Sequence, residues 1–438
     1  MILRFETKGL RAMLKERIEF LSKRKQISRK DLVEGLVTQA HLANILADRY
    51  PLPEDLAEAI AERLGVNPAY LVNASAQDDE TLERAEAIFE QMSVPASVIS
   101  EETVHALEDR DDALTVELST ALMKAVYYQQ LNDAAAYEYI HTSYLNFYLE
   151  KYGRPDDIDL PRPLAKALLY YKVQYYRSKL AYVDVLTHAT RLSELALPGS
   201  EFWLSVQNIK MEAYIHVKRY EEAKQVFDLT MRHVYDQRLF HRLSGLYVAY
   251  SGYCFAMGLV QEALSALTMA EANLVYAGNQ GDLVTAITNN RIVMLTMTGE
   301  LDQAQSEIER FESLLQQEPE ETQQAMKPLV RVYRCEVALA RKNWGVLAQS
   351  VDQLLQCATT PDQQMSAIFY QSHLALAHGD REVFMERALA CLPYFESMQH
   401  IMRLETLYEG MAVVSEDQRK YKEAAMYYRK LVYLLRRK

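Results

Sequence analysis

The sequence is poor in the residues that interrupt helices. Only 14 Gly and 12 Pro occur among its 438 residues, and both disfavour helix interiors. No segment shows the alternating apolar and polar pattern of a half-buried strand over any length. The chain is therefore predicted to be all-α.

Long hydrophobic runs are missing as well. A membrane-spanning helix needs about 18 or more consecutive apolar residues, and no segment approaches that length. The N-terminus carries cations without a following apolar core, so it is not predicted to be a signal peptide. These features predict a cytoplasmic chain without a membrane span.

Cysteine is rare, and its four positions form no Cys-x-x-Cys pair. Each cysteine lies within or near an apolar helical stretch, which favours reduced core thiols in a cytoplasmic protein. The four residues are Cys254, Cys335, Cys357 and Cys391.

Signatures of catalysis are also absent from the sequence. There is no nucleophile arrangement, no metal-ligand spacing and no Gly-rich phosphate loop. His141, His188, His216 and His233 are scattered over predicted helices, and no pair has the His-Glu-x-x-His form of a zinc site. We therefore expect the protein not to be an enzyme, and to have no cofactor or metal.

The net charge of −12 is unevenly distributed. Residues 1–30 hold ten Lys and Arg against three Glu, a net +7, so the remaining chain carries −19. A basic end on an acidic body suits one end that touches phosphate while the rest repels it. The alternative is an amphipathic helix whose charges are only solvated.

What the sequence does contain is a pattern at residues 27–51 that predicts two short helices joined by a tight turn. Ser28 and Thr38 are good N-caps for the two helices, and Gly35 lies near the turn between them. The apolar residues at helical spacing, expected to face inward, are Leu32, Val33, Leu36, Leu42, Ile45 and Leu46. A second helix with a small polar outer face is what a DNA major groove accepts.

The outer face of that second helix holds Gln39, Ala40, His41 and Asn44. Gln and Asn can make bidentate contacts to adenine N6 and N7. The alternative is a small helical hairpin whose polar face is merely solvated, because such patterns are degenerate. The candidate DNA contacts are Lys25, Arg29, Thr38, Gln39, His41 and Asn44.

Helices are also expected on either side of this pattern. One covers residues 5–25, and another over residues 53–65 closes a small domain that we place at residues 1–73. The apolar face of the first helix consists of Leu10, Leu14, Ile18 and Leu21. A short polar stretch from Asn73 is typical of a linker, and residues 74–159 are expected to form a linker helix and the first helical pairs.

From about residue 160 to residue 438 the chain repeats itself. An apolar helix is followed by a short polar turn, then by an aromatic or aliphatic residue three places before a small one. The segments start at Lys218, Gly258, Gly299, Lys342 and Lys420, with a weaker copy at Gly379. The small residues Ala223, Ala263 and Ala304 are spaced by 40 and 41 residues. This pattern resembles the tetratricopeptide repeat with longer helices, and stacked helix pairs of this kind form a right-handed superhelix with a concave inner wall.

Residues at one repeat position are candidates for that inner wall. Asn208 and Asn289 both lie fifteen residues before the small residue of their repeats, and Val248 and Val332 hold the same place elsewhere. An Asn amide can hold the backbone of an extended peptide, and the valines could form pockets for its side chains. The alternative is that these Asn side chains sit on a wet surface.

The complete set of candidate peptide contacts is Asn208, Glu212, Val248, Asn289, Asn290, Arg331, Val332 and His373. Further polar and aromatic candidates nearby are His216, Tyr250, Arg291, Tyr333 and Arg334. An inward-facing Arg would suit a peptide carboxylate or an acidic side chain.

The stretch Val33-Glu-Gly-Leu-Val-Thr-Gln-Ala-His-Leu42 resembles the helix-turn-helix domain of peptide-sensing regulators of Gram-positive bacteria, the Rgg–Rap–NprR–PlcR–PrgX superfamily. The following Pro51-Leu-Pro53 and Leu64-Gly-Val66 fit the same domain. The family's usual Glu-Arg-Gly ending of the recognition helix is replaced by Leu46-Ala-Asp48, a change that bears on DNA affinity rather than on the fold.

The resemblance implies a transcription regulator that acts in quorum sensing. Its helical repeats would bind a short signalling peptide through inner-wall Asn residues, and a homodimer would present two recognition helices to a palindromic DNA site. Another branch of the superfamily binds response regulators as phosphatases or blockers and does not bind DNA. That alternative stays open, as does a peptide-regulated protein-interaction scaffold.

Overall fold

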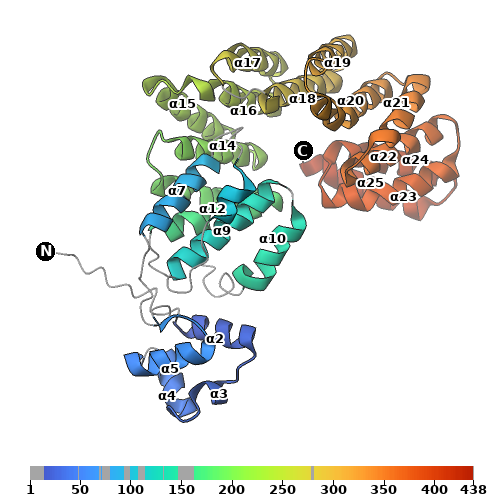
Figure 1. Ribbon diagram of the computed structural model, residues 1–438. Helices are drawn as coiled ribbons and strands as arrows, with labels where there is room; N and C mark the ends of the chain where they lie inside the picture. Colours follow the sequence, from blue (N-terminus) through green and yellow to red (C-terminus); the bar gives the residue numbers. More distant parts are fainter. Residues whose placement is uncertain are drawn as a thin grey trace. The chain divides into compact units, whose positions relative to one another are not determined.

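A computed structural model gives the structure of the protein, and every regular element in the described residues is helical (Figure 1). The described residues are 14–47, 49–68, 71, 79–92, 99–106, 114–131, 133–146, 162–277 and 281–437. Over these ranges no strand occurs, which confirms the all-α prediction. Nor is any helix in them long and apolar enough to cross a membrane.

The described part of the N-terminal domain contains the following helices. They are α2 (Leu14–Lys25), α3 (Arg29–Val33), α4 (Gln39–Leu46) and α5 (Glu54–Leu64). The expected first helix is thus described from Leu14 onward, while Leu10 lies outside the described residues. The turn between α3 and α4 joins the two short helices that the sequence pattern predicts.

Both predicted caps are present. Ser28 Oγ accepts the backbone N–H of Asp31 at 3.2 Å, and Thr38 Oγ1 accepts that of His41 at 3.2 Å. Each cap satisfies one of the free N–H groups at the start of its helix. At the turn, Gly35 has a φ of 74°, a left-handed conformation that a residue without Cβ adopts at little cost.

The inward face of this domain is predicted correctly with one exception. Leu32, Val33, Leu42, Ile45 and Leu46 are all buried. The prediction for Leu36 is wrong, because 37% of its surface is exposed. It lies after the left-handed Gly35, so it no longer follows the helical spacing of α3.

A single arginine ties the closing helix to the first helix of the pair. Arg63, on α5, donates from Nη1 to the carbonyls of Asp31 and Leu32 at 3.0 Å each, and from Nη2 to that of Glu34 at 2.7 Å. These carbonyls lie in and just after α3, where a helix leaves acceptors unpaired. Arg63 therefore holds α3 and α5 in a fixed relation.

Further helices follow the N-terminal domain. The first group is α7 (Asp79–Met92), α8 (Glu101–His105), α9 (Leu114–Gln130), α10 (Ala134–Ile140) and the π-helical turn η1 (His141–Leu145). The predicted domain boundary after residue 73 falls outside the described residues. It therefore stays a prediction.

The remaining helices form the repeats. They are α12 (Arg162–Ser178), α13 (Tyr182–Leu195), α14 (Glu201–His216), α15 (Tyr220–Asp236), α16 (Leu243–Ala256), α17 (Val260–Ala272), α18 (Gly281–Thr298), α19 (Leu301–Leu315), α20 (Glu320–Ala340), α21 (Trp344–Cys357), α22 (Pro361–Ala377), α23 (Arg381–Ser397), α24 (Ile401–Asp417) and α25 (Tyr421–Arg437). Two 3₁₀ turns, η2 (Phe240–Arg242) and η3 (Asn273–Tyr276), complete the set.

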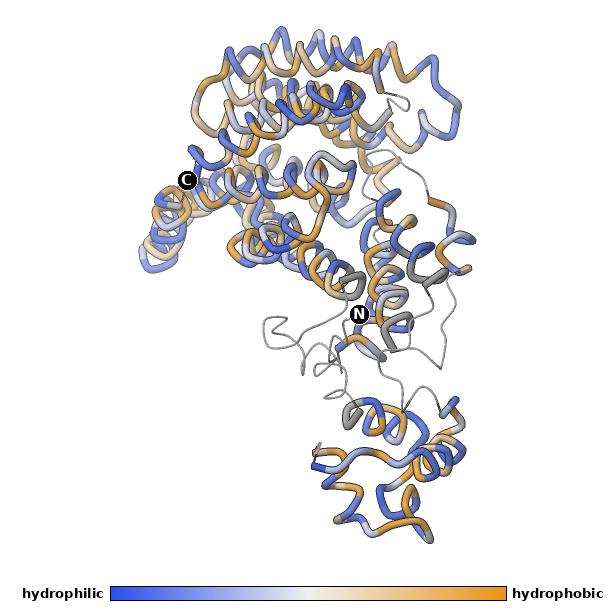
Figure 2. The backbone as a smooth tube through the Cα atoms, turned by 90° about the vertical axis from the view of Figure 1, so that its left-hand side faces the viewer, coloured by the Kyte–Doolittle hydropathy of each residue, from blue (hydrophilic) through white to orange (hydrophobic). Residues whose placement is uncertain are grey.

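The predicted repeat is visible in the turns and in the core. The small or apolar residue of each segment is buried, as in Ala223, Ala263 and Ala304, each 0% exposed. Along the helices, hydrophobic and hydrophilic positions are interspersed (Figure 2), as expected of amphipathic helices that bury one face. Consecutive helices such as α20 and α21, or α24 and α25, pack against each other.

The chain divides into two compact units within the repeat region. Unit 1 comprises Met1–Leu259 and Ala272–Gln280, and unit 2 comprises Val260–Glu271 and Gly281–Lys438. The sequence pattern did not predict a division there, because the segments before and after it have the same repeat spacing. Each unit has buried apolar residues of its own.

Candidate functional site

The outer face of α4 is polar and open. Gln39, Ala40 and His41 are exposed, as predicted, and Asn44 is half-buried. The Thr38 cap fixes the start of the helix at the same end. The buried residues of α4 are Leu42, Ile45 and Leu46, so the helix is held from one side and presents the other.

Two residues that the sequence pattern did not single out fold back onto this face. Arg49 Nη1 donates to Asn44 Oδ1 at 3.0 Å. The ring of Tyr50 stacks on that of His41, with centroids 5.8 Å apart and planes inclined by 20°. Both lie after the end of α4, where helical spacing carries no information about which side chains meet.

The two predicted cations next to the helix pair already have partners. Arg29 Nη2 lies 2.5 Å from Glu19 Oε1, and Lys25 Nζ donates to the carbonyl of Gly65 at 3.4 Å. Both cations are exposed, and exposed ion pairs contribute little to stability. Their charges therefore remain able to face a phosphate.

In unit 1, the candidate peptide contacts Asn208 and Glu212 lie on α14, and Val248 lies on α16. Asn208 Oδ1 is buried and has no hydrogen-bond partner within the described part of the chain. Leaving a buried acceptor unpaired is unfavourable, so a ligand N–H would satisfy it. Glu212, by contrast, pairs with Arg177 at 2.7 Å, and Val248 is half-buried.

Close to Glu212, His216 stacks on Tyr182 with ring centroids 3.9 Å apart. Burial lowers the pKa of His216 and raises that of Tyr182 to about 12. Both side chains are therefore neutral near pH 7. They add aromatic surface next to the Arg177–Glu212 pair rather than charge.

In unit 2, the two adjacent asparagines form a chain of hydrogen bonds. Tyr333 Oη donates to Asn289 Oδ1 at 3.0 Å, and Asn289 Nδ2 is 3.3 Å from Asn290 Oδ1. Tyr333 is buried, and this burial raises the pKa of its hydroxyl, which stays protonated and donates. Asn289 therefore differs from Asn208, because its oxygen already accepts one hydrogen bond and its amide nitrogen already donates one.

The arginines of unit 2 are held by carboxylates on neighbouring helices. Arg331 lies 3.8 Å from Glu312 of α19, Arg334 pairs with the same carboxylate, and Arg291 lies 3.0 Å from Glu271 of α17. A peptide carboxylate would have to compete with these partners. Of the three, Arg331 retains a buried Nε that has no hydrogen-bond partner among the described residues.

His373 lies among aromatic rings on α22. Its ring centroid is 4.6 Å from that of Phe369, and Nε2 is buried without a hydrogen-bond partner among the described residues. Burial lowers the pKa of His373 to about 4. It is neutral at pH 7 and can offer a hydrogen bond but no charge. The half-buried Val332 on α20 packs against the same core of unit 2.

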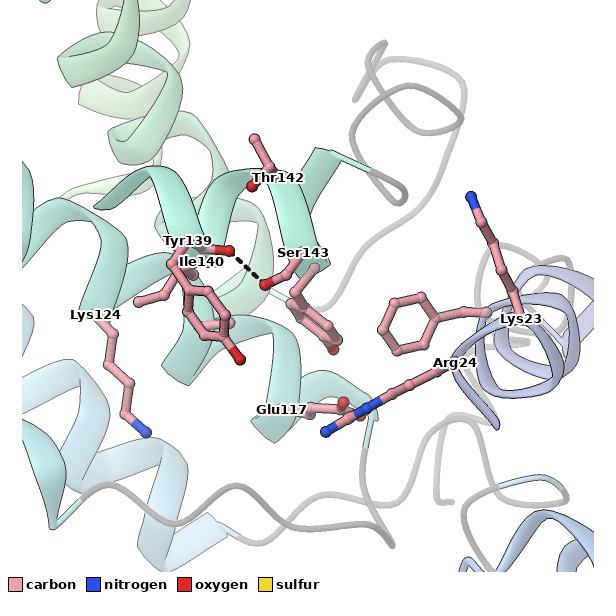
Figure 3. A pocket seen from close by; sticks show the side chains of 11 residues that line it. Lys23, Arg24, Glu117, Lys124, Tyr139, Ile140, Thr142 and Ser143 are labelled. Carbon is pink, nitrogen blue, oxygen red and sulfur yellow. Dashed lines mark hydrogen bonds between the residues drawn. The ribbon is translucent and has the colours of Figure 1, made fainter. Parts of the chain in front are cut away.

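A cavity of about 680 Å³ in unit 1 was not foreseen from the sequence (Figure 3). Lys23 and Arg24 reach it from α2, Glu117 and Lys124 from α9, and Tyr144 from η1. On its wall, Ser143 Oγ donates to the carbonyl of Tyr139, as drawn in Figure 3. Phe20 of α2 meets Tyr144 edge to face at 5.2 Å.

The terminal helix α25 exposes large apolar side chains. Tyr421 is 64% exposed, Val432 47% and Leu435 44%. Exposed apolar residues gathered on one element are typical of an interaction surface.

Comparisons with known proteins identify the fold. No family model matches the chain, and no curated protein matches it significantly in sequence. Among solved structures, a Rap protein in complex with competence and sporulation factor aligns with a TM-score of 0.59 and 16% identity, over 82% of this chain and 97% of that one.

Two further structures align less well. Aspartyl phosphate phosphatase F from Bacillus subtilis has a TM-score of 0.49 and 12% identity, over 82% of this chain and 95% of that one. Bacillus thuringiensis PlcR with the peptide PapR7 and DNA has a TM-score of 0.32 and 12% identity, over 65% and 99%. Of these three alignments, the one with the Rap protein has a TM-score above 0.5 and supports a conclusion about the fold. It confirms the helical-repeat fold that the resemblance to the Rgg–Rap–NprR–PlcR–PrgX superfamily implies.

Proposed function

We propose that the protein is a cytoplasmic DNA-binding transcription regulator whose helical repeats bind a short signalling peptide. The observation that carries the proposal is the outer face of α4. Gln39 and His41 are exposed on a capped helix of a domain that begins with an excess of cations. A short helix of this kind enters the major groove with its N-terminal residues toward the bases.

The repeats supply the second part of the proposal. Asn208 offers a buried acceptor without a partner, and Asn290 offers amide donors beside Asn289. Acceptors and donors of this kind suit the backbone of an extended peptide. The Rap protein of similar fold was solved with competence and sporulation factor, which supports the idea that such a fold holds a signalling factor.

Peptide binding at the repeats would change the affinity for DNA by changing the spacing between the two recognition helices of a homodimer. A homodimer places two recognition helices at a fixed spacing, and half-sites in B-DNA are separated by whole turns. A peptide that favours one pitch of the superhelix shifts the population toward one spacing. A change of a few ångströms then alters the affinity for a palindromic site.

Chromatin immunoprecipitation tests the DNA-binding part. The wild-type chain is expected to enrich a palindromic site, and the double variant Gln39→Ala/Asn44→Ala is expected to lose that enrichment. Gln324→Ala, at an exposed position on α20, is the matched control and should behave as wild type. The absence of any enriched site for the wild-type chain would refute the proposal.

A second candidate function is a regulator that binds another protein and not DNA. The alignment with the Rap protein supports it, because the likeness covers 82% of this chain and 97% of that one. Under this function the polar face of α4 is a solvated surface. The double variant at Gln39 and Asn44 would then leave partner binding unchanged.

A further inference from the structure

The side chain of Asn44 is held in one orientation by Arg49, which lies three residues after the end of α4. Arg49 Nη1 donates to Asn44 Oδ1 at 3.0 Å, and the backbone N–H of Arg49 donates to the carbonyl of Asn44 at 2.9 Å. The two hydrogen bonds join the same pair of residues through backbone and side chain. They fix which end of the Asn44 amide faces outward.

This orientation changes what Asn44 can recognise. Adenine presents an acceptor at N7 and a donor at N6, so an Asn that reads it needs both its N–H and its oxygen. Here Arg49 occupies one of the two lone pairs of that oxygen and sets its guanidinium beside the amide. The amide N–H groups of Asn44 and the remaining N–H groups of the Arg49 guanidinium are all donors, so donors outnumber the one acceptor position that is left.

The neighbouring contact places Arg49 on the same face as the recognition residues. Tyr50, the next residue, stacks on His41 of α4. Arg49 and Tyr50 therefore contact Asn44 and His41, which lie one helical turn apart on the outer face of α4. Arg49 and Tyr50 are both exposed.

We propose that Asn44 and Arg49 act as one donor-rich unit that reads a guanine in the major groove. Guanine presents two acceptors there, O6 and N7, which match donors alone. Arg49 is the specificity-determining residue, because it sets the orientation of Asn44 and adds its own donors. The proposal rests on the DNA-binding function above and specifies the base that this part of α4 prefers.

Selection from a library of DNA duplexes with a randomised central segment tests the pair in the full chain. The wild-type chain is expected to enrich guanine at one position of each half-site. Arg49→Met removes the donors but keeps an unbranched side chain, so Asn44 Oδ1 is freed and the preference should move to adenine. The ratio of guanine to adenine at that position should fall by about tenfold or more.

Two further variants complete the test. Arg49→Lys keeps a donor for Asn44 Oδ1 and should retain guanine, which separates the hydrogen bond from the size of the side chain. Lys30→Met, an exposed cation on α3, should weaken binding equally at all sequences. Circular dichroism of each variant checks that the helices remain.

The outcomes that overturn the inference differ from those that overturn the function. If Arg49→Met only lowers affinity uniformly and reduces the salt dependence by about one phosphate contact, Arg49 binds the DNA backbone and the pair reads no base. If the wild-type chain enriches adenine at that position, the interpretation of Asn44 and Arg49 as a donor-rich unit is wrong. If it enriches no sequence, the DNA-binding function itself fails.

Discussion

Two asparagines at the same repeat position have opposite surroundings. Asn208 Oδ1 is buried and lacks a partner within the described ranges, whereas Asn289 Oδ1 accepts the hydroxyl of Tyr333. An unpaired buried acceptor lowers stability, and a paired one supports its donor. The first residue is therefore suited to a ligand, and the second also serves the fold.

Substituting these two residues should separate the roles. Asn289→Ala leaves the buried Tyr333 hydroxyl without its acceptor and is expected to lower the free energy of unfolding by about 1–2 kcal/mol. Asn208→Ala removes an unpaired acceptor and should change it by less than about 1 kcal/mol. Chemical denaturation of both variants measures the difference. A larger loss for Asn208→Ala would show that its amide is structural.

The buried His373 should make stability depend on pH. Its pKa in the folded chain is about 4, below the 6.5 of an unperturbed imidazole, because burial disfavours the cation. The unfolded chain then binds a proton that the folded chain does not, so stability is lost as the pH falls from about 6.5 toward 4.

His373→Gln should reduce that loss by about 2 kcal/mol. The comparison is between unfolding free energies at pH 7 and pH 5, with His105→Gln, at an exposed position, as the control. Equal pH dependence in wild type and His373→Gln would mean that the folded chain protonates His373 as readily as the unfolded chain does.

At the scale of helices, the turn between the paired helices of these repeats contains one residue in the left-handed backbone conformation. Gly258, Gly299 and Gly379 have φ between 76° and 82°, and Lys218 and Lys342 adopt φ of 60° and 54° at the same place. Only glycine takes this conformation without steric cost. The repeat turn is therefore set by backbone geometry, and glycine is favoured but not required.

Gly299→Ala should destabilise unit 2 although, among the described residues other than its two chain neighbours, no atom lies within 4 Å of the added Cβ. The expected loss is about 1 kcal/mol, from the left-handed backbone alone. Gly345→Ala, within α21 and with nothing closer than 3.9 Å, should be neutral or stabilising. Thermal unfolding of the two variants makes the comparison, and an equal effect of both would exclude backbone strain as the cause.

The sequence predicted the helix caps and the buried small residues of the repeats well. Ser28 and Thr38 cap the helices expected of them, and the buried Ala223, Ala263 and Ala304 follow from spacing. The caps depend on residues three positions apart, and the buried alanines follow from a repeat spacing of 40 and 41 residues that the sequence shows directly.

Contacts between distant or irregular segments were not predictable. The bonds of Arg63 to the end of α3 join residues about thirty positions apart in the sequence. Arg49 reaches Asn44 from beyond the helix end. The hydrogen bond of Tyr333 to Asn289 links two repeats. A periodic sequence pattern does not show which polar side chains form hydrogen bonds with each other.

At the scale of the molecule, the fold and the function are supported to different degrees. The repeat fold follows from the sequence pattern and agrees with the Rap structure. The choice between DNA and protein as the partner depends on one small domain of the chain. Its polar helix and its excess of cations are properties of that domain and are independent of the repeats.

A homodimer through the terminal helix is expected from its exposed apolar residues. Val432→Glu with Leu435→Glu places two charges on that surface and should convert a dimer into a monomer, because burying unpaired charges is unfavourable. Lys422→Glu, exposed on the same helix, is the control. Sedimentation velocity distinguishes the states, and a wild-type monomer at all concentrations would contradict the expectation.

The most direct test of the central claim is the salt dependence of binding between the full chain and duplex DNA of random sequence. Contacts between cations and phosphates release counterions, so affinity should fall steeply and linearly with salt on a logarithmic scale, by about 0.9 for each phosphate neutralised. A slope equivalent to several phosphates, reduced in Lys25→Met/Arg29→Met, is the expected result. No binding at low salt, or binding that salt does not change, would contradict a DNA-binding role for the N-terminal domain.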